Sequence, residues 1–164
     1  MNLKAFLIGV IILFLVFERW SPVHWLALAM YYESRDESFS GRLAVANVVY
    51  NRVRDKRWPS TVRGVVSDGR ERGKSCDFSF MCDGKLENPW SHRSRHWLKW
   101  LQIRAEAFGI WGMHLVGINC DITDGAVFYK RRDTKSPWFE KQIKAGKIEL
   151  VQKNLGAHEF YKFK

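Results

Sequence analysis

The spacing of apolar residues changes along the chain, from one unbroken run to a helical repeat and then to short extended stretches. Residues 5–17 contain only apolar side chains and glycine. From residue 22 to residue 32 the apolar side chains recur at the spacing of one helix face, and they include Trp25, Leu26, Ala29 and Met30. Ser21 suits an N-cap and Pro22 a first helical position. We therefore predict a helix that begins here and breaks near Glu33.

A second helix is predicted over residues 41–54. Its apolar residues lie on nearly all sides, and they are Leu43, Ala44, Val45, Ala46, Val48 and Val49. A helix that is apolar all round is buried, so we expect this one at the centre of the domain. The segment Trp58-Pro59-Ser60 ends the region and precedes a short structured stretch at residues 61–66.

The rest of the chain is predicted to contain one more long helix followed by extended segments. Residues 67–91 form a glycine-containing loop, and loops of this length are often functional. A helix is predicted over residues 92–108, with one stripe expected to pack in the core: Trp97, Trp100, Leu101, Arg104, Ala105 and Phe108. Short strands are expected at residues 126–129 and 157–163, with a helical turn at residues 138–145. This order indicates an α+β fold with a small late β-sheet.

The N-terminal run has the features of an export signal. Lys4 precedes the apolar stretch, and Glu18 and Arg19 close it. A small-x-small cleavage candidate, Ala27-Leu28-Ala29, lies inside the predicted first helix, so cleavage there would remove part of the domain. We therefore predict that residues 1–20 are an uncleaved signal anchor or transmembrane segment. The alternative is a buried core helix, which we disfavour because the run is apolar on every face and a small domain rarely encloses such a helix.

Composition restricts the class of partner more than the class of reaction. The chain of 164 residues suits one domain, with 46% hydrophobic residues and a formal net charge of +10. That charge favours polyanions such as nucleic acid, anionic lipid or an acidic cell wall. No recognisable nucleic-acid-binding motif frames the scattered Lys and Arg residues, so we expect no nucleic-acid partner. The eight Trp residues suit core packing, and one or two of them suit stacking on sugar rings.

The cysteines leave two interpretations open. Cys76 and Cys82 could close a small disulfide loop, which would leave Cys120 unpaired. A zinc site made of Cys76, Cys82, His92 and His96 is the competing idea, but its spacing matches no standard zinc pattern. We expect no metal and no cofactor.

Several segments in order resemble the SleB-type cell-wall hydrolase family, which includes spore-cortex lytic enzymes and phage endolysins. The first two are MYYESRDE at residues 30–37 and GRLAVANVVYNRV at residues 41–53. The later ones are FSF at 78–80 with CDG at 82–84, GAVFY at 125–129, SPW at 136–138 and GAHEFY at 156–161. The resemblance spans about residues 24–162. Departures from the family pattern occur at Tyr32, Asp77, Phe128 and Lys130.

The resemblance implies a lysozyme-like single domain over residues 21–164. It implies cleavage of peptidoglycan between N-acetylmuramic acid and N-acetylglucosamine, by a lytic transglycosylase or a muramidase. It also implies Glu33 as the catalytic residue. Tyr129, Ser79, Phe80 and Glu37 are the candidate substrate-binding residues.

The chemistry explains why one glutamate suits this reaction. A carboxylic acid must protonate the leaving oxygen, and near neutral pH this requires a raised pKa, as burial or a helix C-terminus provides. Ser34 and Glu37 have capping-box spacing, which places Glu33 at a helix end, and Arg35 is expected to point toward Glu37. An ordinary glycosidase also needs a second carboxylate, and the candidates are Asp36, Glu37, Asp77 and Asp83. None is clearly paired with Glu33 in the sequence, which favours a single-acid mechanism.

These inferences combine into one functional hypothesis. We expect a monomer, either anchored in the inner membrane or exported, with its catalytic domain on the periplasmic side and peptidoglycan as its partner. An endolysin for host cell lysis is the first expectation. The alternatives are a bacterial cell-wall remodelling enzyme, a non-catalytic membrane-anchored wall-binding protein and a basic nucleic-acid-binding protein.

Overall fold

The computed structural model describes residues 21–68, 76–84, 89 and 96–164. The predicted signal anchor at residues 1–20 lies outside the described residues. Among those that are described, no helix is both long enough and apolar enough to cross a membrane.

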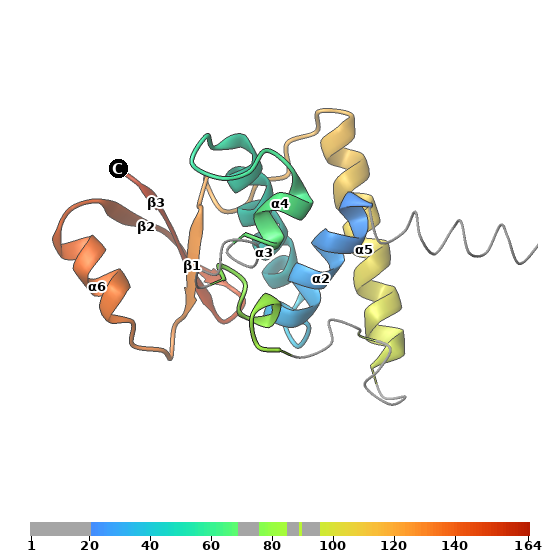
Figure 1. The fold of residues 1–164 in the computed structure, drawn as a ribbon, viewed down its shortest axis with the longest axis horizontal. Helices are drawn as coiled ribbons and strands as arrows, with labels where there is room; N and C mark the ends of the chain where they lie inside the picture. The colour runs from blue at the N-terminus through green and yellow to red at the C-terminus, as the bar shows by residue number, and fades with distance from the viewer. Residues whose placement is uncertain (1–20, 69–75, 85–88, 90–95) are drawn as a thin grey trace, which may run out of the picture.

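The described residues form helices followed by a small sheet, which confirms the mixed α+β prediction (Figure 1). The helices are α2 (Pro22–Ser34), α3 (Phe39–Arg54), α4 (Val62–Val66), α5 (Trp97–Leu115) and α6 (Pro137–Lys144), with a short 3-10 turn at Ser79–Met81. The strands are β1 (Phe128–Arg131), β2 (Ile148–Leu155) and β3 (His158–Phe163). In Figure 1, α5 lies at one end of the molecule, α6 and β2 lie at the other, and α2, α3 and α4 lie between them.

Local hydrogen bonds fix the ends of α2 and the start of α3. The Ser21 hydroxyl caps α2 by accepting the Val23 N–H at 3.2 Å, as expected for an N-cap. The predicted capping box is wrong, because Ser34 is the last residue of α2 and its hydroxyl donates to the Met30 carbonyl at 3.0 Å. The N-cap of α3 is Ser38, which accepts from the Gly41 N–H at 3.4 Å.

Helix α3 occupies the centre of the domain, as its all-round apolar surface predicted. All of its residues from Gly41 to Arg52 are buried. Arg42 is one of the buried residues and makes a two-pronged contact with Glu106 of α5, at 2.7 Å from Nε and 2.6 Å from Nη2. A second small cluster of Ala44, Val48, Ala126 and Phe160 packs α3 against the sheet.

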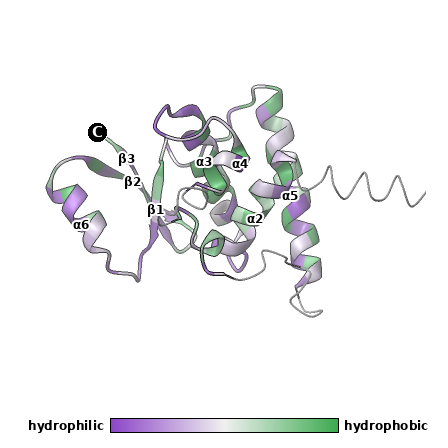
Figure 2. Cartoon of the chain, in the orientation of Figure 1, coloured by the Kyte–Doolittle hydropathy of each residue, from purple (hydrophilic) through white to green (hydrophobic). Residues whose placement is uncertain are grey.

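Helix α5 differs from its prediction in length and in the face that it buries. It begins at Trp97 and runs past Gly109 and Gly112 to Leu115, beyond the predicted end at residue 108. Its buried residues are Trp100, Ile103, Ala107 and Ile110. The predicted core stripe is therefore wrong except at Trp100. Trp97, Leu101 and Phe108 are instead exposed, and the helix is hydrophobic on more than its inner side (Figure 2).

The sheet is antiparallel, in the order β1-β3-β2. The predicted strand at residues 157–163 is β3, and the one at residues 126–129 is β1, which starts two residues later than predicted. Strand β2 was not predicted. It is an edge strand whose burial does not alternate regularly, so its sequence carries no clear period-two pattern.

Candidate functional site

The candidate acid lies at the end of a buried helix and faces a tyrosine from the sheet. Glu33 is the penultimate residue of α2 and is partly buried. Tyr129 lies in β1, where its backbone is fixed opposite Phe160 of β3. The Tyr129 hydroxyl forms a side-chain hydrogen bond with the Glu33 carboxyl. The fold thus brings together two predicted site residues that are 96 positions apart in the sequence.

Burial controls the protonation of this pair. It raises the pKa of the Glu33 carboxyl, while the hydrogen bond from Tyr129 and the positive charge of Arg52 oppose the rise. Burial and the neighbouring Glu33 charge hold the pKa of the Tyr129 phenol well above its usual range. Tyr129 therefore keeps its proton and donates it toward Glu33, which retains its own proton to higher pH than an ordinary glutamic acid.

Arg52 is a site residue that sequence reasoning did not single out. Its side chain is almost fully buried, and its Nε donates to the Val127 carbonyl at 2.8 Å, two residues before Tyr129. Its Nη1 lies 3.2 Å from Oδ2 of Asp77, and the Trp58 indole donates to the same oxygen at 3.0 Å. The available signal was an arginine on an otherwise buried helix, because a buried charge needs a partner.

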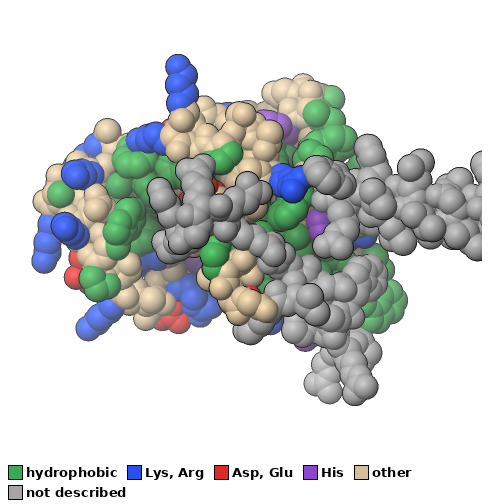
Figure 3. All heavy atoms as spheres, viewed as in Figure 1, with side chains coloured by type: hydrophobic (Ala, Val, Ile, Leu, Met, Phe, Trp, Pro, Cys, Tyr) green, Lys and Arg blue, Asp and Glu red, His purple; other side chains and the backbone are tan. Residues whose placement is uncertain are grey.

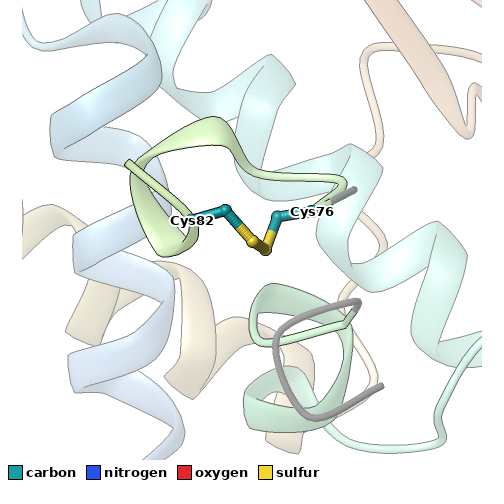
Figure 4. Close-up of a disulfide and its surroundings, with 2 residues drawn as sticks. All are labelled: Cys76 and Cys82. Carbon is teal, nitrogen blue, oxygen red and sulfur yellow. A yellow bond between two sulfur atoms is a disulfide. The ribbon is translucent and has the colours of Figure 1, made fainter. Parts of the chain in front are cut away.

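Asp77 lies inside a small loop closed by a disulfide between Cys76 and Cys82 (Figure 4). The disulfide interpretation is thereby confirmed. The zinc alternative is wrong, because the two candidate thiolate ligands are bonded to each other. The bond holds Asp77 in a closed segment next to Arg52.

The same loop carries the predicted Phe-Ser-Phe contacts. Phe80 is buried, and its ring stacks on Tyr32, with centroids 4.7 Å apart and an angle of 20° between the planes. Tyr32 is the residue before Glu33, so Phe80 supports the helix end that carries the acid. Ser79 is exposed, and its contact with substrate stays a prediction. Phe80 packs against Tyr32 next to the site. Its contact with substrate stays a prediction.

Glu37 joins the helices to the sheet. Its Oε2 accepts the Ala157 N–H at 3.1 Å, and its Oε1 lies 2.9 Å from Nδ1 of the buried His158. Burial lowers the pKa of His158, and the Glu37 carboxylate opposes that shift. Both oxygens of Glu37 are occupied by groups of the chain itself, which favours a structural role over substrate binding.

The remaining acidic candidates lie in different settings. Arg35 does not point toward Glu37 as expected, because its Nε lies 3.6 Å from Oδ2 of Asp36 and its guanidinium lies over the Tyr31 ring. The Asp36 side chain is 86% exposed. Asp77 is paired with Arg52 as described. Among these candidates in the described residues, Glu33 is therefore the carboxyl whose pKa is raised by burial.

Most of the chain matches a known protein family. Residues 36–161 match the family model described as Cell Wall Hydrolase, a segment that includes Tyr129 and begins three residues after Glu33. A spore cortex-lytic enzyme from Bacillus cereus is 36% identical over 66 residues, which are 40% of this chain and 23% of that protein. The corresponding enzyme from Oceanobacillus iheyensis is 33% identical over 66 residues, 40% of this chain and 22% of that protein. The match thus spans about a quarter of the length of these curated relatives.

Two solved structures resemble the whole domain. The catalytic domain of the germination-specific lytic transglycosylase SleB from Bacillus anthracis aligns with a TM-score of 0.60 and 26% identity, over 86% of this chain and 93% of that one. The catalytic domain of the Bacillus cereus SleB protein aligns with a TM-score of 0.53 and 24% identity, over 86% of this chain and 89% of that one, and supports the fold alone.

Proposed function

The chain belongs to the cell wall hydrolase family, and from this premise we propose that it cleaves peptidoglycan glycan strands between N-acetylmuramic acid and N-acetylglucosamine. Glu33 is the general acid and base of the reaction. The observation that carries this proposal is the Glu33 carboxyl itself, whose pKa is raised by burial and which is hydrogen-bonded by Tyr129.

The first step needs a proton. As the bond between C1 of muramic acid and the leaving oxygen breaks, the sugar becomes oxocarbenium-like and the leaving oxygen must be protonated. Glu33 supplies that proton, because burial favours its neutral form. Tyr129 holds the carboxyl in place through its hydrogen bond.

The second step uses the carboxylate left behind. The muramic 6-hydroxyl loses its proton to Glu33 while its oxygen bonds to C1, which gives a 1,6-anhydro end and returns the acid to its starting state. A single carboxyl suffices for both steps. Two observations support this over hydrolysis: Asp77 is already paired with Arg52, and Glu37 is bound to the sheet. The structural likeness to a lytic transglycosylase agrees with it.

The products distinguish the two chemistries directly. Purified peptidoglycan digested with the full chain is expected to yield glycan fragments that end in 1,6-anhydromuramic acid. Such fragments lack one water relative to hydrolytic products, a difference that mass spectrometry resolves. Fragments that have all gained water would contradict the single-acid mechanism and would leave glycan cleavage itself intact.

Replacing Tyr129 with phenylalanine is expected to shift the alkaline side of the pH profile of lysis to higher pH. The hydrogen bond from Tyr129 lowers the Glu33 pKa, so its removal allows burial to raise that pKa further. Activity falls as the acid loses its proton, so the alkaline limb of kcat/KM moves to higher pH in Tyr129→Phe. An alkaline limb that stays fixed or moves to lower pH would contradict the assignment of this limb to Glu33.

The setting of the reaction is a further part of the proposal. We infer that residues 1–20 hold the domain at the membrane, that residues 21–164 act on the periplasmic side, and that the chain serves as an endolysin. The apolar run with its basic flank supports this arrangement, and the net charge of +10 suits an anionic wall. A C-terminal alkaline phosphatase fusion tests it, because this reporter is active only when it is exported.

A further inference from the structure

Helix α5 has a second apolar face that points away from the domain. It consists of Leu98, Leu101, Ala105, Phe108, Leu115 and the following Val116, which we call the outer face of α5. The large side chains of this face range from 42% exposed at Leu101 to 71% at Val116, and Phe108 is 61% exposed. Their spacing of three, four and seven positions places them on one side of the helix, opposite Trp100, Ile103 and Ala107.

The outer face is too continuous to be ordinary surface. Single exposed apolar side chains are normal in soluble proteins, but a row along a whole helix marks a contact surface. No charged residue interrupts the row. Arg104 lies near one edge of it, and Trp97 lies at its start. Aromatic and basic residues beside an apolar stripe are typical of a helix that lies in the interface of a bilayer.

The N-terminal apolar run joins the domain beside this helix. Residues 5–17 lead directly into α2, which begins at Pro22. The first turn of α2 packs on α5, where the rings of His24 and Trp100 are 6.2 Å apart. A bilayer that takes up residues 5–17 would therefore meet the domain at α5 and not at the sheet.

The distribution of charged side chains indicates which end of the domain faces away from the bilayer. Lys and Arg side chains gather at the end formed by the sheet and α6, and hydrophobic side chains show at both ends of this face (Figure 3). Figure 1 places β1, which carries Tyr129, on the opposite side of α2 and α3 from α5. With α5 toward the bilayer, the basic end and the Glu33–Tyr129 pair face the space in which the wall lies.

We propose that the outer face of α5 is a membrane-contact surface that lies in the headgroup region of the bilayer entered by residues 5–17. This proposal rests on the proposed membrane insertion of those residues. It does not depend on the catalytic role of Glu33. It states that lipid covers this surface. The two alternatives are that residues 5–17 fold back onto α5 or that a second copy of the chain packs on it.

The test uses two variants of the full chain, one with a probe on α5 and the other with a probe on α6, at opposite ends of the folded domain. A Cys120→Ser background removes the free thiol, since Cys76 and Cys82 are bonded. Phe108→Cys carries an environment-sensitive fluorophore on the outer face of α5. Trp138→Cys is the matched control, because Trp138 is also an exposed aromatic, at 47%, but lies on α6 at the basic end. Both chains are reconstituted in vesicles of phosphatidylcholine and phosphatidylglycerol, and thermal melting checks that they fold.

The expected result is an asymmetry between the two probes. The probe at 108 emits at shorter wavelength, is quenched by nitroxide-labelled lipids and is several-fold less sensitive to iodide than the probe at 138. A probe at 108 that remains open to iodide would overturn the proposal, as would lipid quenching confined to 138. A probe at 108 that is shielded from iodide but not quenched by the lipids would assign the surface to protein. Diluting the chains to one per vesicle then distinguishes the two protein partners. Shielding that is lost on dilution assigns the surface to a second copy, and shielding that persists assigns it to residues 5–17. Because none of these readouts is lysis, a failure of the catalytic proposal leaves their outcome unchanged.

Discussion

Glu33→Gln is expected to reduce lysis of purified cell walls by about 10²–10⁴-fold, the usual contribution of a general acid. Glutamine keeps the size and the hydrogen-bonding capacity of the side chain but has no proton to give to the leaving oxygen. The measurement is the initial rate of turbidity loss of purified walls, with a zymogram to confirm that the activity belongs to this chain. The loss should appear in kcat, because the acid acts in the chemical step.

The matched control for this change is Asp36→Asn. It alters an acidic residue three positions away in the same manner, at a side chain that is 86% exposed and forms an ion pair with Arg35. Near-normal lysis is expected from this variant. Wild-type rates in Glu33→Gln would rule out the assignment of the acid. Equal losses in the two variants would point to a general effect on charge or folding.

The same substitution should change stability in a pH-dependent way that a damaged fold would not produce. The Glu33 pKa is raised in the folded chain above its ordinary value of 4.5. The neutral Glu33 carboxyl therefore carries no penalty at pH values below 4.5, and its ionisation destabilises the fold as pH rises through the folded pKa. Glutamine does not ionise, so Glu33→Gln should gain unfolding free energy relative to wild type at alkaline pH, by about 1.4 kcal/mol per unit of pKa shift. Denaturant titrations at two pH values measure this gain.

Gly156→Ala is expected to destabilise the fold by about 2–5 kcal/mol. Gly156 has a φ of +64°, and a Cβ at this position would overlap Oε2 of Glu37 and lie 3.2 Å from the Cα of Gly41. A left-handed backbone costs an alanine about 1–2 kcal/mol, and forcing an atom into a packed site costs about 1–3 kcal/mol. The Glu37 carboxylate cannot simply turn away, because it is bound to Ala157 and contacts His158. Chemical denaturation measures the loss.

Gly146→Ala separates the two causes of that loss. Gly146 has a φ of +67°, close to that of Gly156, but nothing lies within 4 Å of the Cβ it would gain. It should therefore show the backbone cost alone, about 1–2 kcal/mol. Equal losses at the two glycines would mean that Glu37 is not held at the junction between helices and sheet.

The sequence predicted the helices where one face or the whole surface is apolar, and it was wrong where two faces compete. Helix α2 and the buried helix α3 follow directly from their spacing. In α5 the aromatic stripe chosen as core is mostly exposed, because a helix that is apolar on opposite sides offers no internal sign of which side packs inward. Strand β2 was missed because an edge strand need not alternate.

Only part of the candidate site could be inferred without the fold. Glu33 and Tyr129 were identified through the resemblance to a known family, and the structure places them in hydrogen-bond contact. The pairing of Arg52 with Asp77 was not foreseen, since it depends on how a loop folds back over α3. The partners of Glu37 were not foreseen for a similar reason, because they lie about 120 positions away along the chain.

The bond between Cys76 and Cys82 makes the final structure of this domain depend on oxidation of two thiols as well as on folding. Thiols stay reduced in the bacterial cytosol and become oxidised once a protein has been exported. Under the proposed export, the loop that presents Asp77 to Arg52 and Phe80 to Tyr32 becomes covalently closed only after the chain has left the cytosol. Oxidation after export would then complete the protein, so that its final form arises next to the wall and away from the ribosome.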